Sequence, residues 1–471
     1  MKKYEITIGI ECHVQLATKT KLFSEVDNDA RGKSPNSCVS PVDYALPGML
    51  PRLNKTAVEM AVTAGLALNS TINLKSRFDR KHYFYPDLPK GYQITQFYSP
   101  IIGPGFVELP SGTKVRIEHA HLEEDAGKLT HFDTYSLVDL NRAGTPLIEI
   151  VSMPDIHSAE DARDYCKELW RLMTYSGVCL GDLYNGNMRF DVNISLAEPG
   201  AKKLGTRAEI KNLNSFRSVE HAVNYEYERQ SKILDRGEKV KQETRGFSDA
   251  TGKTTSQRSK EESQDYRYMP EPDLPPLNLP ASLIEEKRKE LPLLPRDYRH
   301  MFEGATSEPT METLLDYPLL MQKLSELDKT AVSKVANLFS SVLLAEENSS
   351  LLNDPLPSKE QLEDLVKMQE KGDLSSTAVK SVFLKFFDKE MHFKSTETIA
   401  KELNLLQEND TAALEKIVDE VLENPASAQA VADYKAGSEK VIGFLVGQVM
   451  KASHGKANPA AVNKILKEKL K

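Results

Sequence analysis

The chain has 471 residues, of which 40% are hydrophobic and 28% charged, and its formal net charge is −8 at pH 7. This length exceeds one ordinary core and predicts about three domains. The composition is typical of a folded globular protein and excludes a disordered one. Because the chain is acidic, a general affinity for nucleic acid is excluded, and any RNA contact must come from local basic patches.

The sequence carries no signal for export or membrane insertion. Lys2 and Lys3 are followed by acids at Glu5 and Glu11, which interrupt a signal-peptide core. No stretch approaches ~18 uncharged apolar residues, so no transmembrane helix is expected. The four cysteines have no CxxC spacing, which indicates neither a disulfide framework nor a cysteine zinc site. We therefore expect a protein of a reducing compartment, the cytoplasm.

The first predicted element is a strand over Tyr4–Leu16, in which apolar residues alternate on one face. Glu11 and His13 then share the opposite face. A carboxylate and an imidazole at this spacing can ligate one metal ion. A solvent-facing pair is the commoner alternative.

Cations and aromatic rings gather next, in the segment Phe78–Tyr92, which includes Lys81 and Lys90. This combination suits a nucleotide, with lysine on phosphate and a ring on the base. An ordinary aromatic-rich loop packed on a core is the alternative.

The segment His121–Lys128 holds three adjacent acids, Glu123, Glu124 and Asp125, after a predicted strand over Lys114–His121. Adjacent carboxylates repel one another, and a divalent cation would relieve the repulsion. In a strand, Glu123 and Asp125 would share one face and Glu124 the other. A solvated acidic turn is the alternative.

Two helices follow, each signalled by a serine N-cap. Ser158 opens a helix that closes at Gly177, and Ser215 opens one that ends before Gly237. Further strands are predicted at Tyr135–Asp139, Leu147–Val151, Met188–Leu196 and Arg207–Lys211.

Two of these strands carry unlike charges on one face. Arg189 and Asp191 share a face with Asn193, and Glu209 and Lys211 share a face of the next strand. Such faces are costly to bury without a ligand, and a metal–phosphate site would satisfy both signs. Cross-strand salt bridges on an open face are the alternative. The segment Gly246–Thr254 fails as a phosphate loop, because five residues separate its glycines instead of four.

A proline-rich segment divides the chain. Prolines are dense from Met269 to Pro295, which predicts a stiff linker because proline disrupts helices and central strands. After residue 296 the pattern is helical, with a break near 405–410. We predict a first domain at 1–295, a helical domain at 296–407 and a helical tail domain at 408–471.

The tail predicts one helix running to Gly455 and another opening with Asn458 as N-cap and Pro459 at its first position. Several lysines make this end basic: Lys451, Lys456, Lys464, Lys467, Lys469 and Lys471. They either complement helix dipoles or contact phosphate.

Together these stretches match one family, and the chain resembles the B subunits of bacterial tRNA-dependent amidotransferases nearly end to end. The matching segments are Gly9–Val14, Pro47–Pro51, Phe78–Gln93, His121–Lys128, Asp139–Leu147, Arg189–Asn193, Glu209–Arg217, Arg258–Glu261, Asp265–Tyr268 and Phe444–Pro459.

The resemblance implies an α+β fold with a catalytic domain like glutamine synthetase and the guanidino kinases. This domain would have a curved, mainly antiparallel sheet, and all-α middle and tail domains would hold tRNA. The activity would be a ligase that forms C–N bonds with glutamine as amide donor. ATP and Mg²⁺ would serve to phosphorylate the side-chain carboxylate of Glu-tRNA(Gln) or Asp-tRNA(Asn), and ammonia would displace the phosphate. A glutaminase A subunit, which is an amidase, would supply the ammonia, and a small C subunit would complete the heterotrimer.

The resemblance also assigns roles to residues. Glu11, His13 and Glu124 would be metal ligands, and Glu123, Asp191 and Glu209 would serve a second metal or act through water. Lys90 and Arg189 would neutralise phosphates, with Lys81 and Lys211 as further cofactor-binding cations.

One departure concerns zinc. Many family members carry a cysteine pair where this chain has Ser40 and Asp43, and Cys38 has no partner nearby. We therefore expect no structural zinc. Two other functions stay open, a non-catalytic tRNA-binding scaffold and a free-standing metal-dependent ATPase or small-molecule ligase.

Overall fold

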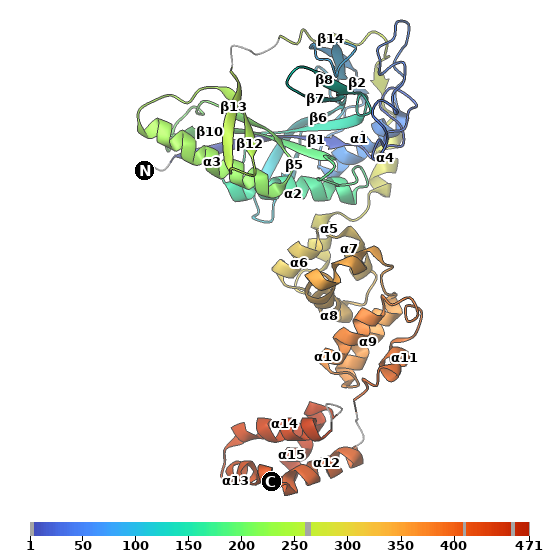
Figure 1. Ribbon diagram of the computed structural model, residues 1–471, viewed down its shortest axis with the longest axis vertical. Coiled ribbons are helices and arrows are strands. Elements are labelled where there is room, and N and C mark those ends of the chain that lie inside the picture. The colour runs from blue at the N-terminus through green and yellow to red at the C-terminus, as the bar shows by residue number, and fades with distance from the viewer. Residues whose placement is uncertain (1–3, 260–264, 408–410, 454–456, 471) are drawn as a thin grey trace. The chain divides into compact units, whose positions relative to one another are not determined.

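The computed structural model describes residues 4–259, 265–407, 411–453 and 457–470. The chain forms two compact units, Met1–Asp297 and Tyr298–Lys471 (Figure 1). The first unit mixes strands and helices and the second is helical, which confirms the expected α+β class with a helical C-terminal region. The finer division of the second unit at residue 407 stays a prediction. Among the described residues, no helix has the length and apolar character needed to cross a membrane.

An eight-stranded sheet forms the centre of the first unit, in the order β13-β12-β11-β10-β1-β9-β6-β5. Its pairs are antiparallel except for the parallel pair β11–β12, as the expected mainly antiparallel sheet requires. The strands are β1 (Glu5–Gln15), β5 (Gly105–Glu108), β6 (Lys114–Glu124), β9 (Pro146–Ser152), β10 (Met188–Ala197), β11 (Ala208–Leu213), β12 (Glu243–Ser248) and β13 (Lys253–Ser259).

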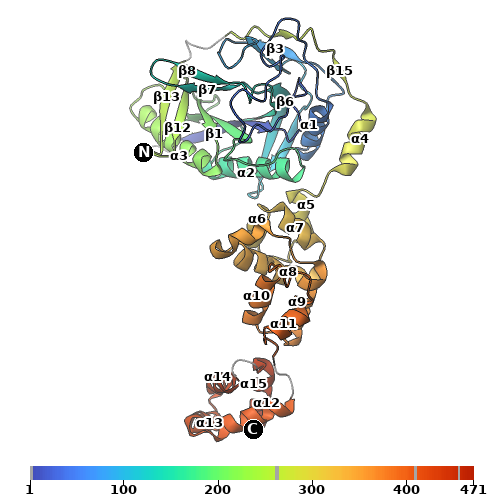
Figure 2. The ribbon, with the colours of Figure 1, turned by 45° about the vertical axis from the view of Figure 1, so that its right-hand side comes forward.

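Helices α2 (Ala159–Tyr175) and α3 (Phe216–Asp235) cover one face of this sheet (Figures 1 and 2). Both predicted N-caps are present, since Ser158 Oγ accepts from the amide of Asp161 and Ser215 Oγ from the amide of Ser218, each at 3.0 Å. The covered face of β1 is fully apolar, with Ile8, Ile10, Cys12 and Val14 each at most 1% exposed. Alternation therefore leaves Glu11 and His13 on the other face.

Short strands and two helices complete the first unit. A three-stranded sheet β14-β3-β4 lies next to the large one, with β4 packed against β6. The elements are α1 (Lys55–Ala67), β2 (Lys75–Ser76), β3 (Asp79–His82), β4 (Tyr92–Thr95), β7 (Lys128–His131), β8 (Ser136–Asp139), β14 (Met269–Pro270), β15 (Leu277–Asn278) and α4 (Ala281–Glu290).

The proline-rich segment is more than the predicted linker. Its strands β14 and β15 pair with β3 and β2, and α4 packs on α1. Arg80 of β3 makes a bidentate ion pair with Glu271, at 2.8 and 2.9 Å. Two-residue strands at a sheet edge tolerate the prolines that exclude a central strand, and the linker at the domain boundary stays a prediction.

The regular elements that the structure describes in the second unit are all helices. Its elements are α5 (Pro295–Met301), which begins in the first unit, α6 (Glu308–Leu314), α7 (Pro318–Ser325), α8 (Lys329–Leu338), η2 (Phe339–Leu343), η3 (Glu346–Asn353), α9 (Lys359–Lys371), α10 (Ser376–Lys385), α11 (Thr396–Glu402), α12 (Thr411–Glu423), η4 (Pro425–Ser427), α13 (Ala428–Lys435), η5 (Glu439–Val441), α14 (Ile442–Ala452) and α15 (Pro459–Lys469).

The last helices share an apolar core that includes Leu414, Leu445 and Leu466. The predicted cap of α15 is present, because Asn458 Oδ1 accepts from the amide of Ala460 at 3.0 Å. The predicted helix end at Gly455 lies outside the described residues.

Candidate active site

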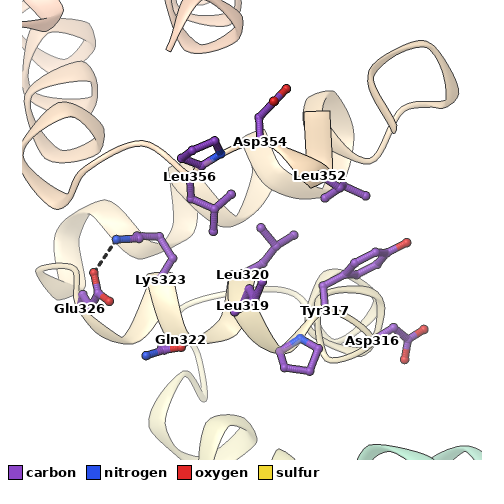
Figure 3. A pocket seen from close by; sticks show the side chains of 12 residues that line it. Asp316, Tyr317, Leu319, Leu320, Gln322, Lys323, Glu326, Leu352, Asp354 and Leu356 are labelled. Carbon is purple, nitrogen blue, oxygen red and sulfur yellow. Dashed lines mark hydrogen bonds and ion pairs between the residues drawn. The ribbon is translucent and has the colours of Figure 1, made fainter. Parts of the chain in front are cut away.

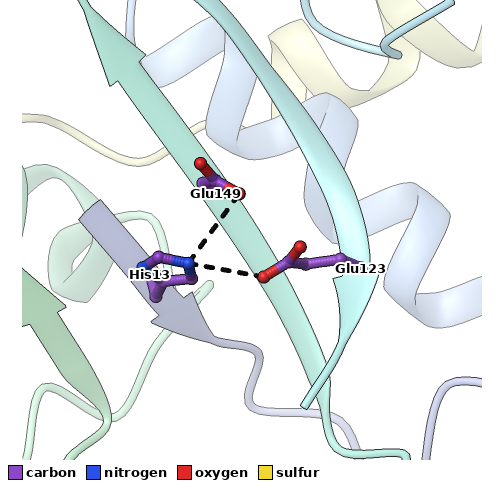
Figure 4. Close-up of side chains that lie close together, drawn as sticks. All are labelled: His13, Glu123 and Glu149. Atoms are coloured by element: carbon purple, nitrogen blue, oxygen red, sulfur yellow. Dashed lines mark ion pairs between the residues drawn. The ribbon is translucent and has the colours of Figure 1, made fainter. Parts of the chain in front are cut away.

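The open face of the sheet brings one histidine and two glutamates together from three neighbouring strands. His13 Nε2 of β1 lies 3.5 Å from Glu123 of β6 and 3.8 Å from Glu149 of β9 (Figure 4). The strand register brings these side chains together. Glu149 of β9 is the register partner of His13 in β1 and of His121 in β6. Glu123 lies two residues after His121 and so shares its face of the sheet. The ligand atoms of His13, Glu123 and Glu149 lie within 4.8 Å of one another. We call them the first ligand group.

His121 forms ion pairs with both glutamates of this group. Its Nε2 lies 3.3 Å from Glu149 and 3.8 Å from Glu123. Burial lowers the pKa of His121, but Glu149 and Glu123 outweigh it and raise the pKa to about 9. In return, and against its own burial, the imidazolium of His121 holds the pKa of Glu149 well below its usual range.

A second group of three carboxylates lies on the next strands. Glu11 of β1 stands opposite Asp191 of β10, and Glu209 of β11 completes the set within 4.8 Å. We call these three the second ligand group. Burial raises the pKa of Glu11, and repulsion from Glu149 adds to the rise. Because Glu149 belongs to the first group, the two groups influence each other electrostatically.

Lys211 neutralises part of the negative charge of the second ligand group. Its Nζ lies 2.8 Å from Asp191 and 3.0 Å from Glu209. Burial lowers the pKa of Lys211, but the attraction of these two carboxylates raises it above its usual range. The lysine is therefore held charged at the edge of the carboxylates.

A cavity of about 280 Å³ connects the two groups with the cations predicted from the sequence. Its lining includes Lys81, Arg189 and Lys211 together with His13, Glu123 and Asp191. Arg189 Nη2 donates to Asp125 at 3.0 Å, and Asp125 raises the pKa of Arg189. Lys81 Nζ lies 4.9 Å from the ring centre of Tyr266. We call this cavity the cation cavity. It lies on the same face of the sheet as the carboxylates of the two ligand groups.

Glu124 and Lys90 are not brought into these groups. Glu124 forms an ion pair with Lys90 and accepts from the amide of Ile94 at 2.9 Å. Burial raises the pKa of Glu124, and Lys90 opposes the rise. Neither Glu124 nor Lys90 lines the cation cavity, whereas Glu123 and Asp125 do, as strand alternation predicts.

The donor sets fit hard or borderline divalent cations. One nitrogen with two carboxylates in the first group, and three carboxylates in the second, are ligands that Mg²⁺ or Mn²⁺ accepts, with water completing the shell. A cation at either position would relieve the repulsion that the clustered acids otherwise retain.

The segment that contains Ser40 and Asp43, where we expect no structural zinc, is held by an ion pair. Lys21, fully buried, donates to Asp43 Oδ2 at 3.1 Å. The same oxygen accepts from the amide of Ser40 at 2.8 Å. These contacts connect the loop to the turn after β1, and the absence of structural zinc stays a prediction.

Comparison with known proteins supplies the family. Residues 6–285 match the model described as GatB/GatE catalytic domain, and residues 320–470 match the GatB domain. The chain belongs to the GatB family. It is 47% identical to the B subunit of the aspartyl/glutamyl-tRNA(Asn/Gln) amidotransferase of Persephonella marina over 100% of both chains. The proteins of the same name from Geobacter sp. (strain M21) and Halorhodospira halophila are each 45% identical over 99% of both chains.

Both ligand groups and the cation cavity lie inside the region that matches the GatB/GatE catalytic domain. Sequence reasoning missed Glu149 as a member of the site. The available signal was a single acid within the apolar strand Leu147–Val151, which is costly to bury without a partner. Finding that partner required the strand order β1-β9-β6.

A further cavity of about 490 Å³ lies in the second unit, between α7 and the segment around η3 (Figure 3). Its lining is mainly apolar, from Tyr317, Leu319, Leu320, Leu352 and Leu356. It holds none of the ligand groups found among the described residues, and we assign it no chemistry.

Proposed function

We propose that this chain is the ATP-dependent subunit of an aminoacyl-tRNA amidotransferase. Its substrates would be Glu-tRNA(Gln), Asp-tRNA(Asn) or both, in keeping with the names of its relatives. The observation that carries the proposal is the pair of ligand groups beside Lys81, Arg189 and Lys211 on one sheet face. Phosphoryl transfer needs this combination, because it depends on positioning and on charge neutralisation.

The reaction would have two steps. A side-chain carboxylate oxygen of the aminoacyl-tRNA attacks the γ-phosphorus of ATP, and ADP leaves. Ammonia then attacks the acyl carbon and phosphate leaves, which yields the amide. Bound Mg²⁺ would polarise phosphoryl oxygens and neutralise their charge.

Each group of residues has a separate part in this proposal. His13, Glu123 and Glu149 would hold one cation, and Glu11, Asp191 and Glu209 a second. Arg189, Lys81 and Lys211 would orient the transferred phosphoryl group. Glu124 remains a predicted ligand through the family resemblance, and it would have to leave Lys90 to reach a metal. Lys90, freed by that exchange, would become available to phosphate.

The mainly antiparallel sheet with helices on one face supports a glutamine synthetase-like or guanidino-kinase-like catalytic domain. The ammonia would come from a partner A subunit with glutaminase activity, and a small C subunit would complete the assembly. The helical second unit would bind tRNA.

The experiment that tests the proposal measures ATP hydrolysis by the assembled complex with Mg²⁺, with and without misacylated tRNA. We expect stimulation by Glu-tRNA(Gln) or Asp-tRNA(Asn), and its loss in Glu11→Gln. Glu108→Gln is the matched control, because Glu108 is an exposed glutamate at the edge of the same sheet.

The alternatives give different results. A rate of ATP hydrolysis that is the same with and without misacylated tRNA would indicate a free-standing ATPase or small-molecule ligase. Unchanged tRNA binding without any hydrolysis would indicate a scaffold.

A further inference from the structure

Aromatic rings form a continuous chain from the surface beside the three-stranded sheet to the cation cavity. Tyr98 contacts Phe97 at a ring-centroid distance of 5.0 Å, and Phe97 stacks on Tyr268 at 3.9 Å with an interplanar angle of 12°. Tyr268 contacts Tyr266 at 6.0 Å, and Tyr266 contacts Tyr83 at 6.1 Å. We call Tyr98, Phe97, Tyr268, Tyr266 and Tyr83 the aromatic track.

The track joins two segments that lie far apart in the sequence. Phe97 and Tyr98 follow β4, whereas Tyr266 and Tyr268 precede β14. Strand β3 lies between β4 and β14 and pairs with both. The buried carboxylate of Asp79 in β3 accepts from the amides of Phe97 and Tyr98, at 3.0 and 2.9 Å. The backbone at the outer end of the track is therefore fixed before any ligand binds.

The outer end of the track is exposed, and the inner end opens on the candidate active site. Phe97 and Tyr98 are each 53% exposed. Tyr83 and Tyr266 line the cation cavity. Aromatic side chains that stay exposed together on a fixed backbone indicate a binding surface. A ligand that covers the outer rings would therefore have a path of further rings to the cavity.

A cation lies over a ring at each end of the track. The guanidinium carbon of Arg77 lies 5.4 Å from the ring centre of Tyr98, and Lys81 Nζ lies 4.9 Å from that of Tyr266. The side chain of Arg77 is 41% exposed. Successive rings with cations beside them match a single-stranded nucleic acid, because its bases stack on aromatic side chains and its phosphates attract positive charge.

We propose that the aromatic track binds the unpaired 3′ end of the aminoacyl-tRNA. This inference rests on the proposed function and deepens it by naming the surface along which the substrate reaches the site. Bases of the unpaired end would stack on Tyr98 and Phe97, and Arg77 would contact a phosphate. The aminoacyl group, carried by the last nucleotide, would then lie in the cation cavity.

A protein partner is the other class of ligand that exposed rings can bind. The inner end of the track favours RNA, because the rings lead into a cavity of about 280 Å³ whose lining includes Lys81, Arg189 and Lys211. The end of an extended, negatively charged strand can enter such a cavity, whereas the surface of a folded protein cannot. The cations there match the phosphates of a nucleic acid.

The test compares uncharged full-length tRNA with the same tRNA lacking its unpaired 3′ end. Dissociation constants are measured by filter binding on the full chain assembled with its partner subunits. Phe97→Leu and Tyr98→Leu each remove a ring and keep an apolar side chain. Phe132→Leu is the matched control, because Phe132 is 48% exposed and stacks on Tyr135 at 4.8 Å between β7 and β8, outside the track.

We expect Phe97→Leu and Tyr98→Leu each to weaken the binding of full-length tRNA by about tenfold, since the loss of one base–aromatic stack has an effect of this order. Both variants should bind the truncated tRNA as wild type does, which shows that they are folded. Phe132→Leu should bind both forms as wild type does. A fluorescent adenine analogue at the 3′ end should be quenched by wild type and less so by Phe97→Leu.

Three results would overturn the assignment alone. The first is equal affinity of the wild-type complex for the two forms of tRNA, and the second is equal loss of both forms in Phe97→Leu and Tyr98→Leu. The third is dissociation of the partner subunits from these variants with tRNA binding unchanged, which would make the track a protein interface. Absence of any tRNA binding by the wild-type complex would instead overturn the proposed function on which the inference rests.

Discussion

Glu123 and Glu124 are neighbours in β6, yet their side chains lie on opposite faces of the strand and contact different residues. Glu123 lies 3.5 Å from His13 on the open sheet face, whereas Glu124 pairs with Lys90 and the amide of Ile94. The two residues have the same chemistry and nearly the same burial, at 3% exposure each. Substitutions of these two residues therefore form a matched pair, which separates the loss of a metal ligand at Glu123 from the loss of the ion pair with Lys90 at Glu124.

We predict that Glu123→Gln lowers the affinity for Mg²⁺ or Mn²⁺ more than Glu124→Gln does. Loss of a carboxylate from the first ligand group should cost at least about tenfold in affinity, since even outer-shell partners cost that much. Metal titration by calorimetry or Mn²⁺ resonance measures it. Equal losses in the two variants would show that Glu124 is itself a ligand, as the family resemblance implies.

Lys211 should stabilise the second ligand group when no cation is bound. In Lys211→Met, the carboxylates of Asp191 and Glu209 lose their counter-ion, so the Tm measured without Mg²⁺ should fall. Added Mg²⁺ binds the native state and should raise the Tm of this variant more than that of wild type. Lys211→Arg keeps the charge and should behave as wild type. Identical Mg²⁺ shifts in wild type and Lys211→Met would contradict the prediction.

The carboxylate of Glu226 should make stability fall at acid pH. Glu226 is fully buried and accepts from Arg229 at 2.8 Å and from Gln230 at 3.1 Å, and it pairs with Arg245 at 3.0 Å. Burial raises the pKa of Glu226, but the hydrogen bonds from Arg229, Thr254 and Gln230 and the charge of Arg229 outweigh burial and lower it below its usual value. A lowered carboxylate pKa contributes stability that is present above the unfolded value and lost as pH falls through the folded value.

We therefore expect Glu226→Gln to destabilise the protein by about 1.5–3 kcal/mol at neutral pH. The difference from wild type should shrink as the pH falls below about 4.5. Urea unfolding at a series of pH values measures both effects. A difference that stays constant from pH 7 to pH 3 would mean that Glu226 is not the titrating group.

The caps of the two covering helices offer a simpler test of stability. Ser158→Ala removes the acceptor for the amide of Asp161 and should cost about 1 kcal/mol, as N-cap losses typically do. Ser215→Ala should cost a similar amount at α3. Thermal unfolding of the two variants measures the effect, and Ser158→Asp should restore stability. Full stability in Ser158→Ala would show that water replaces the cap.

Local signals in the sequence account for much of the fold. Alternation over Tyr4–Leu16 predicts β1 to within a residue at each end, and the two serine caps predict the starts of α2 and α3. The same alternation places Glu11 and His13 together on the open face. These features depend only on neighbours within a few residues, so they can be read from the sequence.

Features that depend on distant partners could not be predicted in this way. Glu149 joins His13 and Glu123 only because β9 lies between β1 and β6. The parallel pair β11–β12 arises because α3 carries the chain back over the sheet between them, and no short-range pattern indicates which strand it will join. The strands of the proline-rich segment could not be predicted for the same reason, since their partners β2 and β3 lie about two hundred residues earlier in the chain.

Strand β1 carries members of both ligand groups and lines the cation cavity through His13, while its other face is core. Since side chains alternate with a period of two, inserting or deleting one residue near its middle would exchange the faces for half the strand. Either Glu11 and His13 would turn into the apolar layer, or Ile8 and Ile10 would turn out of it. Point substitutions on the two faces can be tolerated separately, but a change of length in this strand would remove folding and chemistry in a single event.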